Sequence, residues 1–234
     1  MEPTLPALRP GTLYLVATPI GNLEDITLRA LRVLKECDVV AAEDTRHTGQ
    51  LLHYFRISKP LISYFRFNEA RRGAEILDRL RRGEKVALVT DSGSPGISDP
   101  GERVVCAALE AGFRVEPVPG PCALVAALTA SGLPAAEFHF VGFLPHKSGQ
   151  RRKALERLQG LAATLVLYES PHRLERLLAE LVALMPERQV VLARELTKRF
   201  EEFLSGRPAD LLQAARQRRL RGEFVVVIGP AGAG

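Results

Sequence analysis

The chain has 234 residues, of which 46% are hydrophobic, and it carries a formal net charge of +5. This length suits one large or two small α/β domains, and the lack of any 18-residue apolar run excludes a membrane-spanning helix. The N-terminal segment MEPTLPALRPG lacks the pattern of a signal peptide, so we expect a cytoplasmic protein. Cys37, Cys106 and Cys122 lie far apart without C-x-x-C spacing, which is typical of small buried side chains in a reducing compartment.

Arginine dominates the basic residues, since only six of the 32 are lysines. Two interpretations stay open. The composition can reflect the genome or adaptation to heat. It can also indicate a phosphate-rich partner, because the guanidinium fork matches phosphate geometry.

Apolar runs typical of β-strands alternate with helical patterns along almost the whole chain. The strand-like runs lie at residues 13–17, 39–42, 61–64, 86–90, 115–118, 138–143, 164–168, 190–193, 203–205 and 224–228. The helical patterns lie at residues 28–36, 68–82, 102–111, 122–130, 152–158, 172–184 and 209–219. This alternation predicts an α/β fold with parallel or mixed sheets covered by helices.

A boundary is expected near the Pro/Gly cluster PVPGPC, which divides the chain into near-equal halves. We therefore predict two α/β domains, at residues 1–118 and 119–234. In the second domain, the short run EEFLSG predicts an antiparallel edge strand.

The first strand-like run leads through the loop TPIGN into a helix. Many α/β proteins hold a phosphate or nucleotide on such a strand–loop–helix unit. This loop, however, contains one glycine rather than G-x-G-x-x-G, and it has no P-loop Gly-Lys-Ser/Thr. The pattern thus indicates a ligand loop without indicating a pyrophosphate.

The second strand-like run ends in five consecutive polar residues, Glu43 to His47. Open α/β sheets bind ligands at the carboxyl ends of their strands, so this segment is a candidate site. Because consecutive elements are usually neighbours, we expect it to share an edge with the opening loop, on an adjacent strand. The alternative is structural: Asp44 or Thr45 caps the next helix, and Asp44 pairs with Arg46.

The loop after the fourth run, TDSGSPGISDPGER, is much longer than the roughly 2–6 residues that an α/β connection needs. Gly93 and Gly96 permit close approach of a ligand, and Ser94 and Asp99 offer polar contacts. A compatible structural interpretation makes Asp99 the N-cap of the next helix, with Pro100 at its first position.

Two later strand ends also carry neighbouring acids and bases. These residues are Glu169, Ser170, His172 and Arg173, and then Arg194, Glu195, Thr197 and Lys198. Each acid–base pair can be a simple salt bridge or part of a site. The loop PGPCALVAALTASGLP adds small residues that allow close packing or ligand approach.

Six segments taken together resemble one family. They are TPIGNLEDITLRAL, AAEDTRHTG, DSGSPGISDPG, PGPCALVAALTASGLP, YESPHRL and ARELTK. They are similar, in this order, to the bacterial 16S ribosomal RNA cytidine-2′-O-methyltransferases of the tetrapyrrole methylase superfamily. The resemblance extends over residues 11–229. It implies two α/β domains with S-adenosylmethionine in the cleft between them, commonly a homodimer, and methylation of a ribose 2′-hydroxyl in the 16S RNA of the small ribosomal subunit.

The resemblance also implies a set of donor-binding residues. Because S-adenosylmethionine has no phosphate, the absence of both phosphate motifs is understandable. The implied residues are Pro19 and Gly21 in the opening loop, Asp91, Gly93, Ser94 and Ile97 beside the methionine part, and Thr129, Ala130, Ser131, Tyr168, Ala193 and Glu223 near the methionine or adenosine parts.

A ribose hydroxyl is a weak nucleophile at neutral pH, so a base or an orienting cation should assist. The candidates are Glu43 and Asp44 for the hydroxyl proton, and Arg46 and Lys198 for a phosphate or the developing alkoxide. Glu169 and Glu195 are alternatives that would orient these cations. No metal-binding cluster is apparent, and the reaction requires none.

One departure from the family concerns a histidine-rich H-x-H-N-E segment, which here reads Phe65-Arg66-Phe67-Asn68-Glu69. A histidine at these positions therefore cannot be the indispensable base of this protein. The two phenylalanines either pack in the core or stack on an RNA base.

For the RNA itself, we expect electrostatic contacts from the arginine-rich segments, with Arg151-Arg152-Lys153 as first choice. Two other functions stay open. One is a tetrapyrrole C-methyltransferase, whose usual first loop is richer in glycine, and the other is a non-catalytic RNA-binding protein of ribosome assembly.

Overall fold

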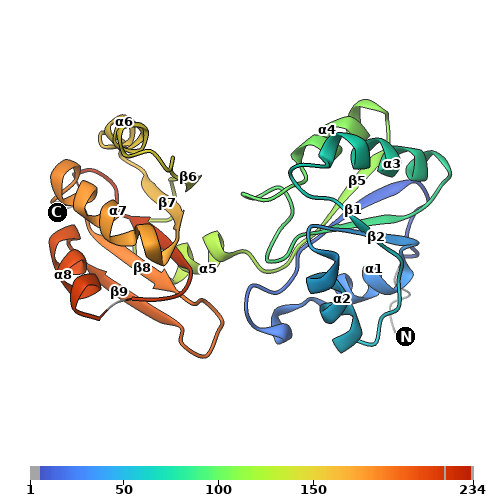
Figure 1. The fold of residues 1–234 in the computed structure, drawn as a ribbon, viewed down its shortest axis with the longest axis horizontal. Coiled ribbons are helices and arrows are strands. Elements are labelled where there is room, and N and C mark those ends of the chain that lie inside the picture. The colour runs from blue at the N-terminus through green and yellow to red at the C-terminus, as the bar shows by residue number, and fades with distance from the viewer. Residues whose placement is uncertain (1–5, 219, 233–234) are drawn as a thin grey trace. The chain divides into compact units, whose positions relative to one another are not determined.

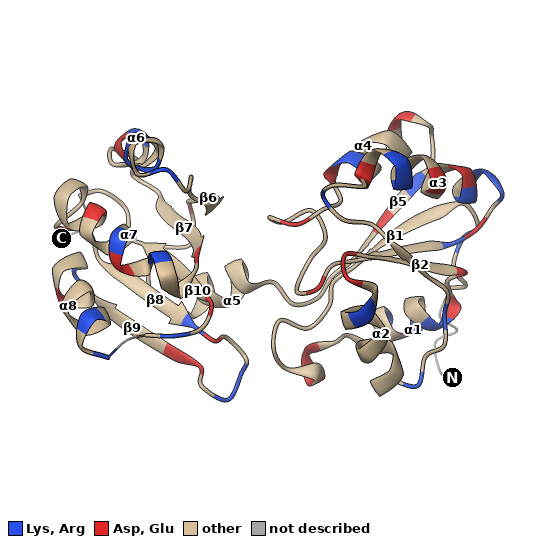
Figure 2. Cartoon of the chain, viewed as in Figure 1, with Lys and Arg blue, Asp and Glu red and all other residues tan. Residues whose placement is uncertain are grey.

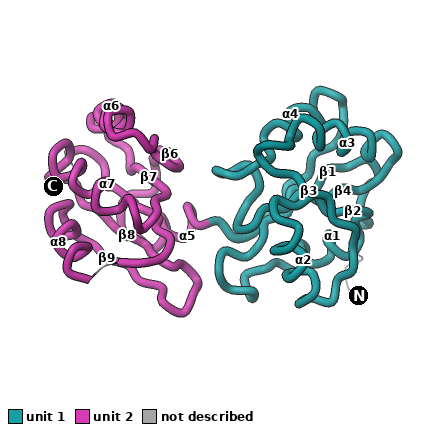
Figure 3. The backbone as a smooth tube through the Cα atoms, in the orientation of Figure 1, with its two compact units in different colours: residues 1–122 teal, residues 123–234 magenta. Residues whose placement is uncertain are grey.

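The structure is a computed structural model that describes residues 6–218 and 220–232 (Figure 1). The chain forms two compact units, Met1–Cys122 (unit 1) and Ala123–Gly234 (unit 2), which we describe separately (Figure 3). The boundary predicted between residues 118 and 119 lies at the end of the last strand of unit 1, four residues before this division.

Unit 1 contains five strands and four α-helices within the residues that the structure describes. The strands are β1 (Thr12–Val16), β2 (Val39–Ala42), β3 (Leu61–Ser63), β4 (Val86–Val89) and β5 (Arg114–Val118). The helices are α1 (Leu28–Glu36), α2 (Thr45–Tyr54), α3 (Glu69–Arg81) and α4 (Glu102–Glu110), and a 3₁₀ turn spans Leu23–Asp25.

The sheet of unit 1 is parallel throughout, in the order β3-β2-β4-β1-β5. Alternate residues of its central strands belong to two separate cores. Side chains of α1 and α2 pack against one face, and those of α3 and α4 pack against the other (Figure 1). Burial on both faces explains why β2 and β4 read as uninterrupted apolar runs.

Unit 2 contains a mixed sheet in the order β6-β7-β10-β8-β9. Its strands are β6 (Phe138–Phe143), β7 (Thr164–Glu169), β8 (Val190–Arg194), β9 (Glu202–Gly206) and β10 (Phe224–Ile228). Its helices are α5 (Ala123–Ala130), α6 (Ser148–Leu158), α7 (Pro171–Leu184) and α8 (Pro208–Arg218). The core on one face joins the sheet to α6, α7 and α8, while α5 contacts β7 and β10.

The ten predicted strands are all present, and β9 is the antiparallel edge strand that the sequence predicted. The seven predicted helices are also present, although α6 begins four residues earlier than expected and residue 219, the predicted end of α8, lies outside the described residues. The helix list omitted α2, which starts within the polar segment after β2.

The structure contradicts two interpretations of burial, those of the cysteines and of core packing for the two phenylalanines. Only Cys37 is buried among the cysteines, since Cys106 is exposed and Cys122 is partly exposed. Phe65 and Phe67 do not pack in the core, because 38% and 89% of their surfaces are exposed.

Among the described residues, no helix is long and apolar enough to cross a membrane.

Candidate functional site

The carboxyl ends of β1, β2 and β4 lie at one edge of the unit 1 sheet because all three strands run parallel. The expectation that β1 and β2 are neighbours is wrong, since β4 lies between them. The loop after β4 is therefore flanked by the opening loop on one side and by the polar segment after β2 on the other. From this central position the β4 loop can contact both of the other segments of the site.

The opening loop is tied directly to the β4 loop. Thr18 and Gly93 form an isolated antiparallel bridge, with N–H to carbonyl distances of 2.9 and 3.1 Å, and the Thr18 hydroxyl donates to the carbonyl of Thr90 at 3.0 Å. Gly93 has a φ of +85°, a conformation that favours glycine. The predicted donor residue Pro19 directly follows this bridge.

Ser94 continues the same loop, and its hydroxyl donates to the carbonyl of Pro121 at 3.3 Å. Ile97 ends the predicted donor segment with a partly exposed side chain. Gly96 has a φ of +84°, and a Cβ there would meet no atom within 4 Å. The segment from Asp91 to Ile97 is thus held at Gly93 and Ser94 and open at Gly96.

The polar segment after β2 is hydrogen-bonded to the β4 loop in both directions. The backbone N–H of Asp44 donates to Asp91 Oδ1 at 3.1 Å, and the backbone N–H of Asp91 donates to Glu43 Oε2 at 3.4 Å. The structure therefore brings the predicted catalytic Glu43 and the predicted donor-binding Asp91 together, although 48 residues separate them.

Three carboxyl groups, Glu43, Asp91 and Asp99, interact electrostatically at this edge. Burial raises the pKa of Asp99 to about 7, with further contributions from the charges of Glu43 and Asp91. Burial likewise raises the pKa of Glu43, and the carboxylates of Asp91 and Asp44 act in the same direction. Within the described part of the chain, these three groups form no salt bridge, so the edge is anionic.

The predicted capping role of Asp99 is wrong. Helix α4 begins at Glu102, and its N-cap is Gly101, which makes no side-chain capping hydrogen bond. Gly101 has a φ of +149°, and a Cβ there would lie 3.1 Å from the backbone nitrogen of Gly96. The loop therefore folds back on itself before the helix starts, and Asp99 stays within the loop.

Asp44 adopts the structural role that the sequence left open. Its carboxylate accepts a hydrogen bond from the backbone N–H of Arg46 at 2.8 Å, which caps α2, and it pairs with the Arg46 guanidinium at 2.9 Å. The hydrogen bonds from Arg46 lower the pKa of Asp44 to about 2. A catalytic role for these two residues stays a prediction. Glu43, in contrast to Asp44, forms no salt bridge with any residue that the structure describes.

Predicted donor residues of unit 2 gather at one edge of its sheet. Tyr168 of β7 and Ala193 of β8 are both register partners of Val225, and Glu223 directly precedes that strand. The Tyr168 hydroxyl accepts the backbone N–H of Leu124 at 3.2 Å, which ties α5 to this edge. Ala193 is fully buried, so any contact it makes with a ligand would involve its backbone.

Thr129, Ala130 and Ser131 lie at the C-terminal end of α5. The Thr129 hydroxyl donates to the carbonyl of Val125 at 2.8 Å, and the Ser131 hydroxyl donates to that of Leu128 at 2.8 Å. Both hydroxyls are therefore engaged with their own helix, and their contact with the donor stays a prediction.

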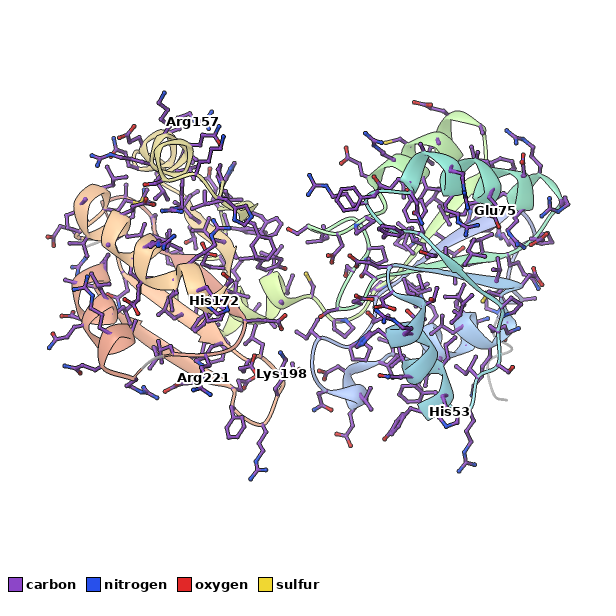
Figure 4. The ribbon with its side chains drawn as sticks, viewed as in Figure 1. His53, Glu75, Arg157, His172, Lys198 and Arg221 are labelled. Carbon is purple, nitrogen blue, oxygen red and sulfur yellow. The ribbon has the colours of Figure 1, made fainter. Side chains whose placement is uncertain are left out.

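Lys198 lies between β8 and β9 (Figure 4) and contacts two carboxylates. Its ammonium lies 3.1 Å from Glu195 Oε1 and 2.8 Å from Glu223 Oε2. Glu195 also accepts the backbone N–H of Glu223 at 3.0 Å. An RNA phosphate would have to displace one of these carboxylates, so a catalytic role of Lys198 stays a prediction.

The third strand end, after β7, forms a buried charge cluster. Glu169 is almost fully buried, accepts the backbone N–H of Ser170 at 2.7 Å and lies 3.3 Å from the Arg173 guanidinium. Burial raises the pKa of Glu169. Arg173 also donates to the carbonyl of Leu144 at 2.7 Å, which indicates that this pair stabilises the fold of unit 2.

The first choice for an RNA contact is partly wrong, because Arg151 is buried. Its guanidinium donates to both carboxylate oxygens of Glu180, at 2.6 and 2.8 Å, and to the carbonyl of His146 at 3.3 Å. Arg152 and Lys153 are exposed. Arg151 is thus structural, while its two neighbours face solvent.

The chain is similar to known methyltransferases. The family model for Tetrapyrrole (Corrin/Porphyrin) Methylases matches residues 12–212. Ribosomal RNA small subunit methyltransferase I of Halalkalibacterium halodurans is 50% identical over 218 residues, which cover 93% of this chain and 75% of that protein. The protein of the same name from Escherichia coli O157:H7 is 48% identical over 221 residues, covering 93% and 77%.

The fold matches solved structures in the same way. Uroporphyrin-III C-methyl transferase from Thermus thermophilus, complexed with S-adenyl homocysteine, superposes with a TM-score of 0.65 at 24% identity, over 93% of this chain and 97% of that one. Sequence identity near 50% over nearly the whole chain and a family model spanning most of it lead to one conclusion. The chain belongs to the tetrapyrrole (corrin/porphyrin) methylases and, within them, to the family of ribosomal RNA small subunit methyltransferase I.

Proposed function

We propose that this enzyme transfers the methyl group of S-adenosylmethionine to the 2′-hydroxyl of a cytidine in 16S ribosomal RNA. The relatives named for the small-subunit RNA support the substrate. The observation that carries the proposal is the pair of hydrogen bonds that joins Glu43 and Asp44 to Asp91. They hold the Glu43 carboxylate, which has no salt bridge among the described residues, against the loop assigned to the methyl donor.

The chemistry of the unit 1 edge suits this donor. S-adenosylmethionine carries a sulfonium and an ammonium group and no phosphate, and the carboxyl groups of Glu43, Asp91 and Asp99 favour a cation. A nucleotide phosphate would be repelled by the same groups. The open backbone at Gly96 leaves room for close approach of the ligand.

The chain supplies orientation and proton transfer, and S-adenosylmethionine supplies the activated methyl group. The ribose oxygen forms the new carbon–oxygen bond as the methyl–sulfur bond breaks and its electron pair leaves with sulfur. Glu43 accepts the hydroxyl proton and later releases it to water. Burial that raises the pKa of Glu43 makes its carboxylate a stronger base, as long as it is ionised at the working pH.

The remaining assignments are part of the same proposal. Tyr168, Glu223 and the segment 129–131 bind the methionine or adenosine parts of the donor, Arg46 contacts a phosphate beside the target ribose, and Lys198 supports it. The enzyme acts in the cytoplasm as a homodimer.

The decisive experiment measures transfer of labelled methyl groups to purified small subunits, to free 16S RNA and to a porphyrinogen. We expect transfer to ribosomal RNA and none to the porphyrinogen. Transfer to the porphyrinogen would instead identify a tetrapyrrole C-methyltransferase. A rise in melting temperature with S-adenosylmethionine is expected because the ligand binds only the native state, and its absence would indicate a non-catalytic RNA-binding protein.

The role of Glu43 is tested with Glu43→Gln, Asp44→Asn and Arg46→Ala under saturating donor. We expect Glu43→Gln to lower turnover by about 10²- to 10⁴-fold, as loss of a general base does, with unchanged donor affinity. Glu110→Gln, which alters an exposed carboxylate at the end of α4, is the matched control. Near wild-type turnover in all three variants would make this segment structural.

A further inference from the structure

The segment that follows β3 displays two phenylalanines on the surface of unit 1. Phe67 is 89% exposed, more than any other aromatic side chain that the structure describes, and Phe65 is 38% exposed. The two rings contact each other edge to face, with centroids 6.2 Å apart and planes at 71°. Adjacent exposed aromatic rings indicate a binding surface.

The backbone holds this pair in place. The N–H of Phe65 donates to Asn68 Oδ1 at 2.8 Å, and the N–H of Asn68 donates back to the carbonyl of Phe65 at 2.9 Å. The Asn68 amide also donates to the carbonyl of Ser63 at 3.2 Å, which anchors the turn to the end of β3. Binding to this turn therefore requires little ordering of its backbone.

The surroundings of the rings are basic. Arg66 and Arg71 are exposed, and Arg103 of α4 is exposed with only a long contact of 3.7 Å to Glu69. Glu69, the one acid in residues 65–71, is largely shielded and accepts a hydrogen bond from the buried Tyr64 hydroxyl. Aromatic rings beside exposed arginines match a nucleobase with its flanking phosphates.

The turn lies beside the candidate catalytic segment. Strand β3 pairs in parallel with β2, where Ser63 is the register partner of Ala42, and the N–H of Tyr64 donates to the carbonyl of Ala42 at 2.7 Å. By this register Glu43 is level with Tyr64, and Phe65 follows one residue later along the β3 segment. The rings thus belong to the same carboxyl edge as Glu43.

We propose that Phe65 and Phe67 form a stacking platform for a nucleobase of the single-stranded RNA segment that carries the target ribose. The platform rests on the proposed RNA methylation and deepens it, because it fixes the RNA one residue along from Glu43. A second copy of the chain is disfavoured as the occupant, since its identical basic patch would face this one.

The test measures binding of a single-stranded RNA containing 2-aminopurine, by quenching of its fluorescence. Base–aromatic stacking corresponds to about a 5- to 150-fold change in affinity per base, so Phe67→Leu and Phe65→Leu should each weaken binding within this range. Phe67→Trp should restore binding, because it restores a ring. The salt dependence should not change, since no phosphate contact is lost.

The matched control is Phe200→Leu, which removes a ring that is 65% exposed in unit 2 and lies beside Arg199. This variant should bind RNA like the wild type. Calorimetry with S-adenosylmethionine should give wild-type donor affinity for all four variants, which excludes misfolding as the cause.

Each other outcome is decisive. If the wild type methylates ribosomal RNA and Phe67→Leu binds and methylates it equally well, the platform is overturned and the proposed function stands. If the wild type neither binds nor methylates RNA, the proposed function itself fails. If Phe67→Leu changes the sedimentation of the protein while RNA affinity is intact, the rings are a protein contact and the platform is overturned.

Discussion

Asp99 lies in the loop between β4 and α4, where burial and the charges of Glu43 and Asp91 raise its pKa to about 7. In the unfolded chain the same carboxyl has an ordinary pKa of 3.8. Between these values the native state holds a proton that the unfolded state has lost. The free energy of unfolding therefore decreases as the pH rises from about 4 to about 7, and the contribution is lost above the folded pKa.

Asp99→Asn should remove this component of the pH dependence. Urea denaturation at pH 5 and pH 8 should show that the wild type loses more stability over this interval than the variant does. Glu110→Gln should retain the wild-type slope. Equal slopes for wild type and Asp99→Asn would contradict the position of Asp99 among these carboxyl groups.

Binding of a cation should lower the pKa of Asp99, whereas burial and the neighbouring carboxylates raise it. S-adenosylmethionine carries positive charge, so its binding favours the ionised carboxyl and releases a proton near neutral pH. Calorimetry in two buffers of different ionisation enthalpy measures this proton directly. We expect release by the wild type at pH 6.5 and a clear reduction in Asp99→Asn, and an unchanged proton count would separate Asp99 from the donor.

The sequence could not predict this role of Asp99. Its local pattern, an aspartate before a proline at a helix start, is typical of an N-cap. The structure differs from this pattern because the loop continues past Asp99, so that Gly101 precedes the helix. The neighbours that shift its pKa come from another strand end and another part of the loop, and residue types in one segment do not reveal them.

At the scale of elements, Gly120, which follows β5, packs closely against Ala17, which follows β1. A Cβ at this position would lie 2.9 Å from Ala17 Cβ. Gly120→Ala should therefore cost about 1–3 kcal/mol, as overpacking does, and should weaken donor binding because Pro121 holds Ser94. Urea denaturation and calorimetry measure the two effects.

Gly73→Ala is the matched control for Gly120→Ala. Gly73 lies within α3, and a Cβ there meets no atom within 4 Å beyond its own helix. The substitution should stabilise the protein by about 0.5–1 kcal/mol through helix propensity. A neutral effect of Gly120→Ala would show that the loop can move away from β1 without loss.

Helix α6 carries one buried arginine, Arg151, next to the exposed Arg152 and Lys153. Arg151→Ala should destabilise the protein by about 3–5 kcal/mol, because it leaves Glu180 without its partner in a shielded position. Lys153→Ala on the exposed face should change the free energy of unfolding by less than about 0.5 kcal/mol. Comparable effects of the two substitutions in urea denaturation would contradict this distinction.

Hydrophobic periodicity predicted the strands well because the central strands of both sheets are buried. It failed for α2, whose first turn is polar and also resembles a ligand loop, and Asp44 serves as the cap of that helix. The order of strands was beyond local patterns, since β4 pairs between β2 and β1 although 44 residues separate the end of β2 from the start of β4. The β2 segment and the opening loop nevertheless share an edge, because every strand of unit 1 is parallel.

At the scale of the whole molecule, ion pairing reduces the number of arginines available to RNA. Figure 2 shows basic and acidic residues interspersed along α3. There Arg72 and Arg79 both pair with Glu75, and Arg81 pairs with Asp78. These arginines can be counted in the sequence, but their ion-pair partners could not be predicted from it.

RNA binding should still weaken as salt increases, with a slope of about −0.7 per phosphate contact on a single strand. Arg66→Ala and Arg71→Ala should each make the slope shallower by about 0.7, because these side chains are exposed beside the proposed platform. Arg79→Ala, which removes a paired arginine on α3, should leave the slope unchanged. A salt titration of RNA affinity checks all three, and a flat wild-type titration would reject an electrostatic footprint.

The separation of the two sheets along the sequence has a consequence for synthesis on the ribosome. Every strand of the first sheet ends by Val118, and every strand of the second begins at or after Phe138. The first sheet can therefore close before the strands of the second have emerged. Within it, β1 is made first, and among the described residues its partners are β4 and β5. The oldest strand of the nascent chain therefore waits longest for its partners. During that wait the apolar run of β1 is the segment that a chaperone at the tunnel exit would protect.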